Sequence, residues 1–174
     1  MATTTPSHKP DMFLAVKGKK SGAIKGEAID KAHVDQIDVL EWSWGVRSPH
    51  DRDSGLLTGK RQHQELRVVK KVDKATTALY SVACTNETLT EVVLTVRKGG
   101  TAAATGVPTA DFLTIKIEQA FIVSLETRAA TEGDGHALTE SVGFSFKKIT
   151  ISYAPQGTEG TLGATSTFSD EWST

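Results

Sequence analysis

The chain is poor in cysteine and in long apolar runs, and each shortage excludes a class of protein. Cys84 is the only cysteine among 174 residues, so neither an intrachain disulfide nor a zinc site built from several thiolates can form. No apolar run approaches the roughly 18 residues of a membrane-spanning helix. Residues 1–10 lack the apolar stretch of a secretory signal, so we expect synthesis in the cytoplasm and export, if any, by another route.

An excess of charge of either sign is also missing. Lys and Arg number 20 and Asp and Glu number 21, which gives a net charge of −1 and a sequence pI of about 6.5. Binding to nucleic acid or to an anionic membrane calls for a clustered basic excess. We therefore expect no nucleic-acid partner and no insertion into a membrane.

The chain is rich in residues branched at Cβ. There are 23 Thr, 14 Val and 8 Ile, together 45 of the 174 residues, and 15 glycines accompany them. Branching at Cβ stiffens the side chain and suits a pleated surface. This composition favours a mainly β fold over a helical bundle, and the chain is long enough to bury its own core.

Alternation of apolar and polar residues places the strands. Segment 34–47 has apolar residues at Leu40, Trp42, Trp44 and Val46, but the opposite phase before Leu40, and this slip is typical of a β-bulge. A helical spacing of Val34, Ile37, Leu40 and Trp44 is the weaker alternative. Further strands are predicted at residues 12–16, 64–72, 91–97, 113–125 with a bend near Gln119, 138–146, and 149–153 in the opposite phase.

Between the strands we expect one helix and one extended loop. The spacing of Ala75, Leu79 and Val82 predicts a short helix with Asp73 as its N-cap. Residues 48–62 are polar and turn-rich, with Leu56 and Leu57 as an apolar landing site for a partner. The prediction is therefore a small β-barrel of two antiparallel sheets over residues 11–155, with a flexible extension at 1–10, a soft linker at 99–106 and a tail at 156–174 that is ordered only against a neighbour.

The sequence contains no recognisable catalytic or cofactor motif, so we expect no enzyme and no cofactor. Three groups of residues allow a chemical reading and a more favoured structural one. Glu27, Asp30 and His33 would suit a metal on a helix, but fit a solvated turn better. His50, Asp51 and Asp53 suggest a catalytic cluster, but such residues also keep loops soluble. Cys84 is expected as a small buried residue rather than a nucleophile.

Trp42 and Trp44 are expected in the core rather than around a ligand, although a ligand platform remains the alternative. The lysine pairs at 70–71 and 147–148 are expected on solvated or edge surfaces. A neutral β protein with a long loop and no active-site pattern points to assembly.

Several segments, in this order and spacing, resemble the Hcp family, the tube proteins of bacterial type VI secretion. They are residues 11–14, 24–28, His33, 37–45, 59–61, 72–76, Glu140, 144–149 and Tyr153. The chain departs from the family pattern at Ala28, at Thr77 and in the residues before Asp11. The resemblance implies a small barrel with a flanking helix, six copies in a ring, rings stacked into a tube, and no covalent chemistry.

The resemblance also implies partners and roles. The expected partners are further copies of the chain, effector proteins in the ring lumen, and the sheath and spike of the secretion machine, which would carry the tube out of the cell. Ser43 is expected to face the lumen, and the loop to reach the adjacent ring. The ring-stacking residues are expected to be His50, Asp51, Arg52, Asp53, Leu56 and Leu57. The structural residues of the family motif are Gly26, Glu27, Trp42, Trp44, Gly45, Asp73, Phe144, Phe146 and Tyr153.

Three alternatives stay open at this point. A monomeric barrel would bind a small ligand near Trp42 and Trp44 and would behave as a single 18.6 kDa chain. A hydrolase would lose a measurable activity on mutation of His33 or His50. A phage-type tail tube protein differs from the favoured reading only in the signature segments.

Overall fold

Strands dominate the computed structural model, which describes residues 11–97, 110–132, 135–155 and 162–172. The expected extension at 1–10 and the whole of the linker at 99–106 lie outside these residues. In chain order the elements are β1 (Asp11–Gly18), β2 (Gly22–Ile24), β3 (Ile37–Ser43), β4 (Val46–Arg47), β5 (Gln62–His63), β6 (Leu66–Lys71), α1 (Thr76–Thr85), β7 (Leu89–Arg97), β8 (Asp111–Glu132), β9 (Gly135–Ser145), β10 (Lys148–Tyr153) and β11 (Ser166–Glu171).

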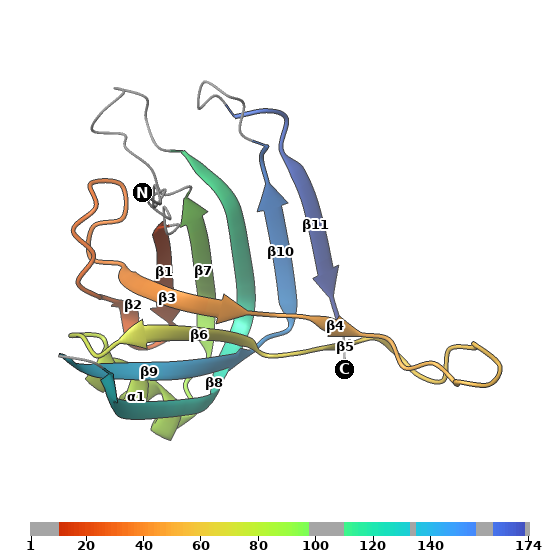
Figure 1. The fold of residues 1–174 in the computed structure, drawn as a ribbon, viewed down its shortest axis with the longest axis horizontal. Helices are drawn as coiled ribbons and strands as arrows, with labels where there is room; N and C mark the ends of the chain where they lie inside the picture. Colours follow the sequence, from red (N-terminus) through yellow and green to blue (C-terminus); the bar gives the residue numbers. More distant parts are fainter. Residues whose placement is uncertain (1–10, 98–109, 133–134, 156–161, 173–174) are drawn as a thin grey trace, which may run out of the picture.

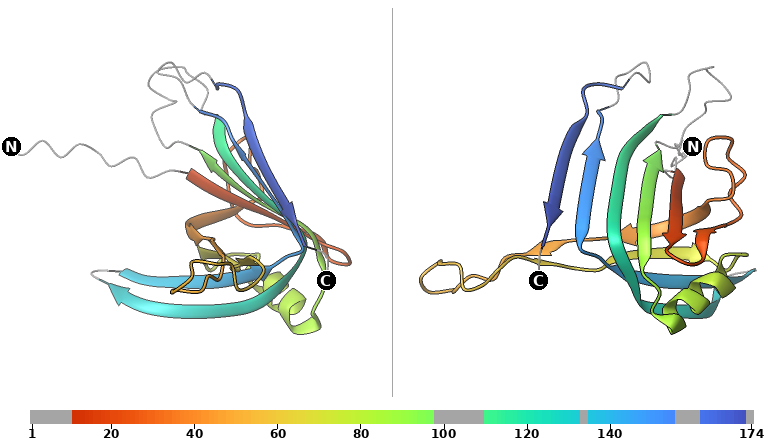
Figure 2. Two further views of the ribbon diagram at one scale, coloured as in Figure 1. Left: turned by 90° about the vertical axis from the view of Figure 1, so that its right-hand side faces the viewer. Right: turned by 180° about the vertical axis from the view of Figure 1, so that it is seen from behind.

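Six antiparallel strands close into the predicted barrel. The hydrogen-bonded order is β8, β7, β1, β3, β6 and β9, and the second half of β8 pairs with β9 to complete the circuit. β10 and β11 extend the sheet beyond β8, and β2 pairs with the end of β1. Figures 1 and 2 show the resulting two layers meeting at an angle, with β1, β7, β10 and β11 in one and β3, β6 and β9 in the other. α1 lies against β8 and hydrogen-bonds to it from Tyr80 to Thr127.

Apolar side chains from both layers fill the barrel. Leu14, Ile37, Leu94 and Phe144 are fully buried, and Leu79 of α1 packs with them. Burial of each such side chain contributes about 1.5–3 kcal/mol relative to leaving it exposed. The strands predicted from alternating residues therefore supply the core.

The bulge predicted at Leu40 is confirmed. The pairing of β3 with β6 shifts register between Val39 and Glu41, so one residue of β3 has no opposite partner. This slip lets Val39 on one side of it and Trp42 on the other both turn inward, while Ser43 stays exposed.

The bend predicted near Gln119 is also confirmed. The alternation of residues 113–125 predicts that Phe121 and Val123 share the buried face of Ile115 and Ile117, and this prediction is wrong. Gln119 has φ 50°, a left-handed conformation that costs a residue with a Cβ about 1–2 kcal/mol. This turn inverts the alternation, so that Ala120 is buried while Phe121 and Val123 are exposed. Phe121 and Val123 therefore do not continue the buried face of the first half of β8.

The prediction of an extended loop without regular structure at residues 48–62 is wrong. β4 pairs with β5, and a bridge joins His50 to Leu57, so the chain makes one long hairpin over residues 46–63. Figure 1 shows this long hairpin projecting along the longest axis of the molecule, away from the barrel.

Four smaller expectations are corrected. Lys70 is fully buried rather than solvated, and Cys84 is exposed rather than buried. Asp73 is not the N-cap of α1, which is Ala75, although the Asp73 carboxylate accepts a hydrogen bond from the Ala75 backbone N–H at 2.9 Å. Part of the tail forms β11, which pairs with β10 of the same chain rather than waiting for a neighbour.

Candidate assembly surfaces

The outer face of the layer that contains β3 is polar and exposes Ser43. The strand register places Ser43 beside Arg67 of β6, and Arg67 beside Gly143 of β9. The Glu65 carboxylate accepts a hydrogen bond from the Ser124 hydroxyl at 3.1 Å and pairs with the Arg67 guanidinium at 3.2 Å. This face can contact a partner through small and charged groups.

The tip of the long hairpin is a defined turn with exposed apolar side chains. The Asp51 carboxylate accepts hydrogen bonds from the Asp53 and Ser54 backbone N–H groups at 3.0 and 2.7 Å, which lowers the pKa of Asp51. Leu56 and Leu57 are 69% and 68% exposed. Exposed leucines on an ordered turn suit a docking contact better than they suit solvent.

The possible catalytic cluster in the hairpin is absent. His50 uses its Nδ1 atom on the Ser48 carbonyl at 2.7 Å, while the Asp51 carboxylate is occupied by its own turn. In the described part of the chain the His50 ring therefore makes no hydrogen bond to Asp51 or Asp53, and Arg52 and Asp53 are exposed.

An aromatic cluster anchors the base of the long hairpin, and the sequence analysis does not predict it. His63 of β5 stacks on Trp172 at 4.3 Å and on Trp44 at 5.6 Å between ring centroids, and Phe146 packs against Trp172. The Asp170 carboxylate of β11 faces His63 Nε2 at 2.8 Å and is also bound by the Arg61 guanidinium. More than 100 residues separate the two sides of this contact.

The same contact sets the acidity of Asp170. Hydrogen bonding from Arg61, then from His63, together with their charges, holds the pKa of Asp170 at about 2, against 3.8 ordinarily, although partial burial works in the other direction. β11 therefore ties the base of the long hairpin to the barrel through one carboxylate and one indole ring.

Glu27, Asp30 and His33 have separate structural roles and do not converge on a metal. The Glu27 carboxylate accepts from the Lys74 backbone N–H at 3.1 Å. Asp30 pairs with Arg97 at 2.8 Å, and buried His33 stacks on Phe13 at 4.3 Å. Within the described residues no group of three or more possible ligands gathers. His33 is buried, so the expectation of a solvated turn is wrong for this residue.

A second buried polar group was missed from the sequence because its members are far apart in the chain. Lys70 and Glu140 are both fully buried and their charged atoms lie 2.7 Å apart. Asp73 also contacts the Lys70 ammonium, at 2.8 Å, and the Thr76 hydroxyl donates to Glu140 at 3.0 Å. The group stabilises the contact between β6, β9 and the start of α1.

The remaining motif residues are structural in this chain. A Cβ on Gly26 would lie 2.4 Å from the Gln36 carbonyl oxygen, so only glycine lets these backbones approach. Gly45 faces the end of the Gln64 side chain, which can move aside, so this position does not demand glycine in the same way. Phe144 and Phe146 are buried, and Tyr153 packs edge-on against Phe112.

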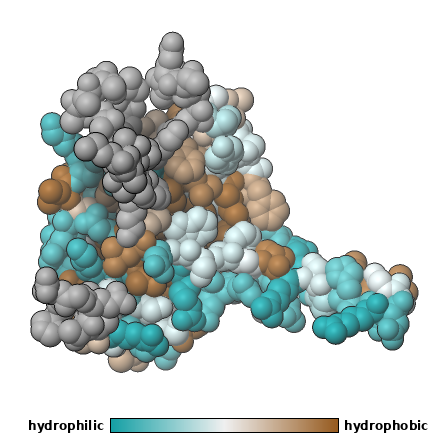
Figure 3. All heavy atoms as spheres, viewed as in Figure 1, coloured by the Kyte–Doolittle hydropathy of each residue, from teal (hydrophilic) through white to brown (hydrophobic). Residues whose placement is uncertain are grey.

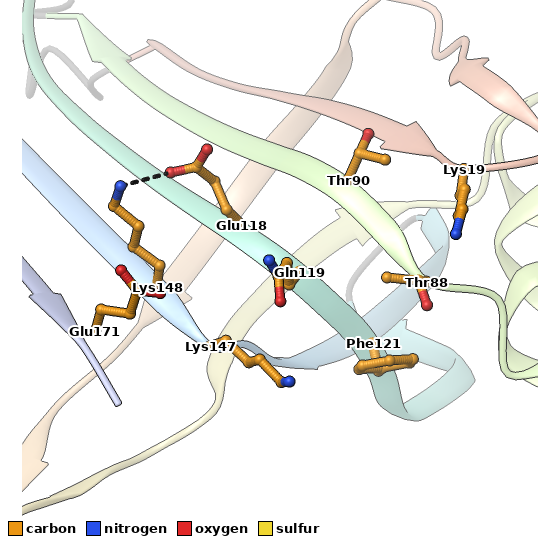
Figure 4. Close-up of a pocket in the computed structure, with 9 residues that line it drawn as sticks. All are labelled: Lys19, Thr88, Thr90, Glu118, Gln119, Phe121, Lys147, Lys148 and Glu171. Atoms are coloured by element: carbon orange, nitrogen blue, oxygen red, sulfur yellow. Dashed lines mark ion pairs between the residues drawn. The ribbon is translucent and has the colours of Figure 1, made fainter. Parts of the chain in front are cut away.

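A surface hollow of about 610 Å³ lies at the bend of β8 (Figure 4). Phe121 lies between Lys19 and Lys147 at its edge, and the Lys148 ammonium pairs with Glu118 at 3.6 Å. The lining combines charges of both signs with an exposed aromatic ring, and these groups suit contact with another surface.

Comparisons with known proteins agree with the resemblance seen in the sequence. A family model described as "Type VI secretion system effector, Hcp" matches residues 13–153. Protein hcp1 of Pseudomonas aeruginosa is 33% identical over 152 residues, 86% of either chain, and the Major exported protein of that organism is 28% identical over 173 residues, 92% of this chain and 94% of that protein. A solved type six secretion system protein superposes with a TM-score of 0.76 at 27% identity, covering 90% of this chain and 91% of that one.

No helix in the described part of the chain is long and apolar enough to cross a membrane. The family match spans most of the barrel, and the relative at 33% identity extends over nearly the whole chain. On this evidence the chain belongs to the Hcp family of type VI secretion system proteins.

Proposed function

We propose that this chain forms six-membered rings that stack into the tube of a type VI secretion system and carry effector proteins in the lumen. The observation that carries the proposal is the family match over residues 13–153. The sheath and spike of the machine would be its further partners. A relative is the Major exported protein, which supports the same fate for this chain, secretion from the cytoplasm with the tube.

Uncovered surfaces at one side of the barrel support self-assembly. Among the described strands β11 pairs only with β10, so its outer edge keeps free backbone groups. On the face that continues the core, Tyr153 and Phe168 are 45% and 49% exposed. Figure 3 shows a hydrophobic area over this part of the sheet. An edge and an apolar face that differ from the opposite side of the molecule suit a head-to-tail ring.

The exposed polar face around Ser43 is the proposed lumen wall. Across the adjoining strands Ser43 lies next to Arg67, Arg67 next to Gly143, and Gly143 next to Ser124, so the small side chains on this face leave room for cargo. Its charged groups are of both signs, which suits weak contact with varied proteins.

The lumen proposal is tested with Ser43→Gln. We expect this variant to keep the ring mass and to lose at least most of the effector captured in a pull-down, because the longer side chain occupies the cargo surface. Ser81→Gln, at an exposed position of α1, is the matched control and should retain capture. Equal capture by Ser43→Gln and by the parent protein would refute the role of Ser43.

The stacking proposal is tested by deleting residues 51–57 from the long hairpin. Since β4, β5 and the barrel lie outside the deletion, we expect rings to persist and tubes to disappear in electron micrographs. Intact tubes would show that rings stack without the hairpin tip.

The barrel interior gives no support to a monomeric ligand-binding protein. Fully buried Leu14, Leu94 and Ile117 fill it, and Trp42 and Trp44 pack against this core. A filled barrel of six strands leaves the tryptophans as packing residues rather than as a ligand platform.

A further inference from the structure

The two ends of the molecule along its longest axis present different exposed side chains. The long hairpin projects from one end, and the segment between β2 and β3 lies at the other (Figure 1). In this second segment, residues 25–36, Ile29 is 95% exposed and Val34 is 61% exposed. A single exposed isoleucine is common on protein surfaces, but Ile29 also lines a hollow with Met12, Phe13 and Leu40, and together these side chains form an apolar surface that suits a partner.

The segment that displays Ile29 and Val34 is held rigidly. The Gly26 and Ala28 backbone N–H groups donate to the Asp35 and Gln36 carbonyls at 2.7 and 2.9 Å. Asp30 is fixed by its ion pair with Arg97, described above. A surface fixed in advance loses little entropy when a partner docks on it.

An acidic hollow adjoins Ile29. This end hollow, of about 380 Å³, is lined by Asp11, Asp30, Asp38, Met12, Phe13, Ile29, Val39 and Leu40. Asp30 is paired with Arg97, but neither Asp11 nor Asp38 has an ion-pair partner among the described residues. Burial, with the nearby charges of Asp73 and Asp11, raises the pKa of Asp38. The nearby charge of Lys71 works in the other direction. The hollow therefore gathers three carboxylates, of which only Asp30 is held in an ion pair among the described residues.

The tip of the long hairpin is complementary to this end hollow. It exposes Leu56 and Leu57 beside Arg52, whose guanidinium has no ion-pair partner in the described part of the chain. Figure 3 shows hydrophobic spots at the far end of an otherwise hydrophilic projection. The tip thus offers apolar side chains to meet Ile29 and Val34, and a cation to meet the carboxylates of the end hollow.

We propose that the hairpin tip of one copy docks in the end hollow of the next copy, with Leu56 and Leu57 against Ile29 and Val34, and Arg52 facing Asp38. The proposal rests on the stacking of rings proposed above and names the surface that receives the hairpin. Because donor and acceptor lie at opposite ends, the contact repeats without closing and builds an open stack.

A charge exchange tests the pairing of Arg52 with Asp38. Arg52→Asp or Asp38→Arg alone places like charges together, and we expect either to reduce the protein that sediments as tubes by about tenfold or more. The double variant restores the opposite charges in every contact and should restore sedimentation. Asp38→Arg combined with Arg47→Asp, a change on the exposed stem of the same hairpin, is the matched control and should not restore it.

Crosslinking tests the apolar contact. In a Cys84→Ser background, Leu57→Cys and Ile29→Cys in one chain should give a ladder of oxidised oligomers, whereas Leu57→Cys with Val123→Cys, at an exposed position of the barrel, should not.

The charge exchange and the crosslinking together distinguish failure of the docking site from failure of ring stacking. If the parent protein forms tubes but the charge exchange shows no rescue and the Leu57–Ile29 ladder is absent, the docking site is wrong while stacking stands. If the parent protein forms no tubes, both proposals fail. Circular dichroism and the ring mass of each variant confirm that folding is unchanged.

Discussion

The barrel buries one lysine and one glutamate, Lys70 and Glu140, which must find each other when the chain folds. Lys70 sits on a strand face that otherwise carries Leu66 and Val68, and it is fully buried with Glu140. An ion pair in such a place returns little net stability, because both ions lose their hydration. Removing one partner is far more costly, since the other charge is then left uncompensated.

Lys70→Met should lower the free energy of unfolding by about 3–5 kcal/mol. Lys70→Met combined with Glu140→Leu should recover part of that loss, because only the Asp73 carboxylate then remains, and it keeps its hydrogen bond from the Ala75 backbone N–H. Urea denaturation at one fixed protomer concentration measures both. A single variant as stable as the parent would contradict the burial of this pair.

Asp170 gives the molecule an acid-sensitive anchor with a definite direction. Its folded-state pKa of about 2 lies below the ordinary 3.8, so its contribution to the free energy of unfolding is complete above about pH 4 and disappears as the pH falls towards 2. Asp170→Asn should therefore lower the melting temperature near neutral pH, and the difference from the parent should vanish near pH 2. A difference that stays constant across this range would exclude Asp170 as the source.

At the scale of elements, alternation and composition were enough to predict most strands, the short helix and the bulge at Leu40, because each depends on neighbouring residues. The failures involve contacts between distant segments. The partner of Lys70 lies 70 residues away, and the anchor of the long hairpin joins β5 to β11. The side-chain reversal after Gln119 could not be predicted, because the hydrophobic pattern does not show that Gln119 adopts a left-handed backbone conformation.

The candidate surfaces divide in the same way. The apolar tip at Leu56 and Leu57 and the exposed Ser43 could be predicted from the sequence, since a turn-rich segment and a strand phase place them. The exposed Ile29 could not, because nothing local distinguishes an isoleucine held outward by backbone hydrogen bonds from one in a core.

The anchoring of the long hairpin by β11 predicts how its order responds to mutation. Trp172→Ala removes the indole ring stacked on His63. In protein that has not assembled into tubes, trypsin should therefore cut this variant faster than the parent at Arg52 and Lys60, while the barrel resists. Glu171→Ala, at the neighbouring exposed position, is the control and should behave as the parent. Fragment masses over time give both rates, and equal rates for Trp172→Ala and the parent would refute the anchor.

At the scale of the whole molecule, the near-zero net charge is consistent with assembly. A chain with a net charge of −1 repels its copies little, whereas a strong field of one sign would oppose both stacking and the release of varied cargo. The free edge of β11, the bare apolar face beside it and the long hairpin all lie outside the closed barrel. The barrel therefore folds alone, and the surfaces left over are those that a ring and a tube would use.

Light scattering of the purified protein tests this account most directly. If the chain forms six-membered rings, the particle has a mass close to six protomers of 18.6 kDa, or a multiple of that mass where rings stack. A single species near 18.6 kDa at all protein concentrations would contradict it.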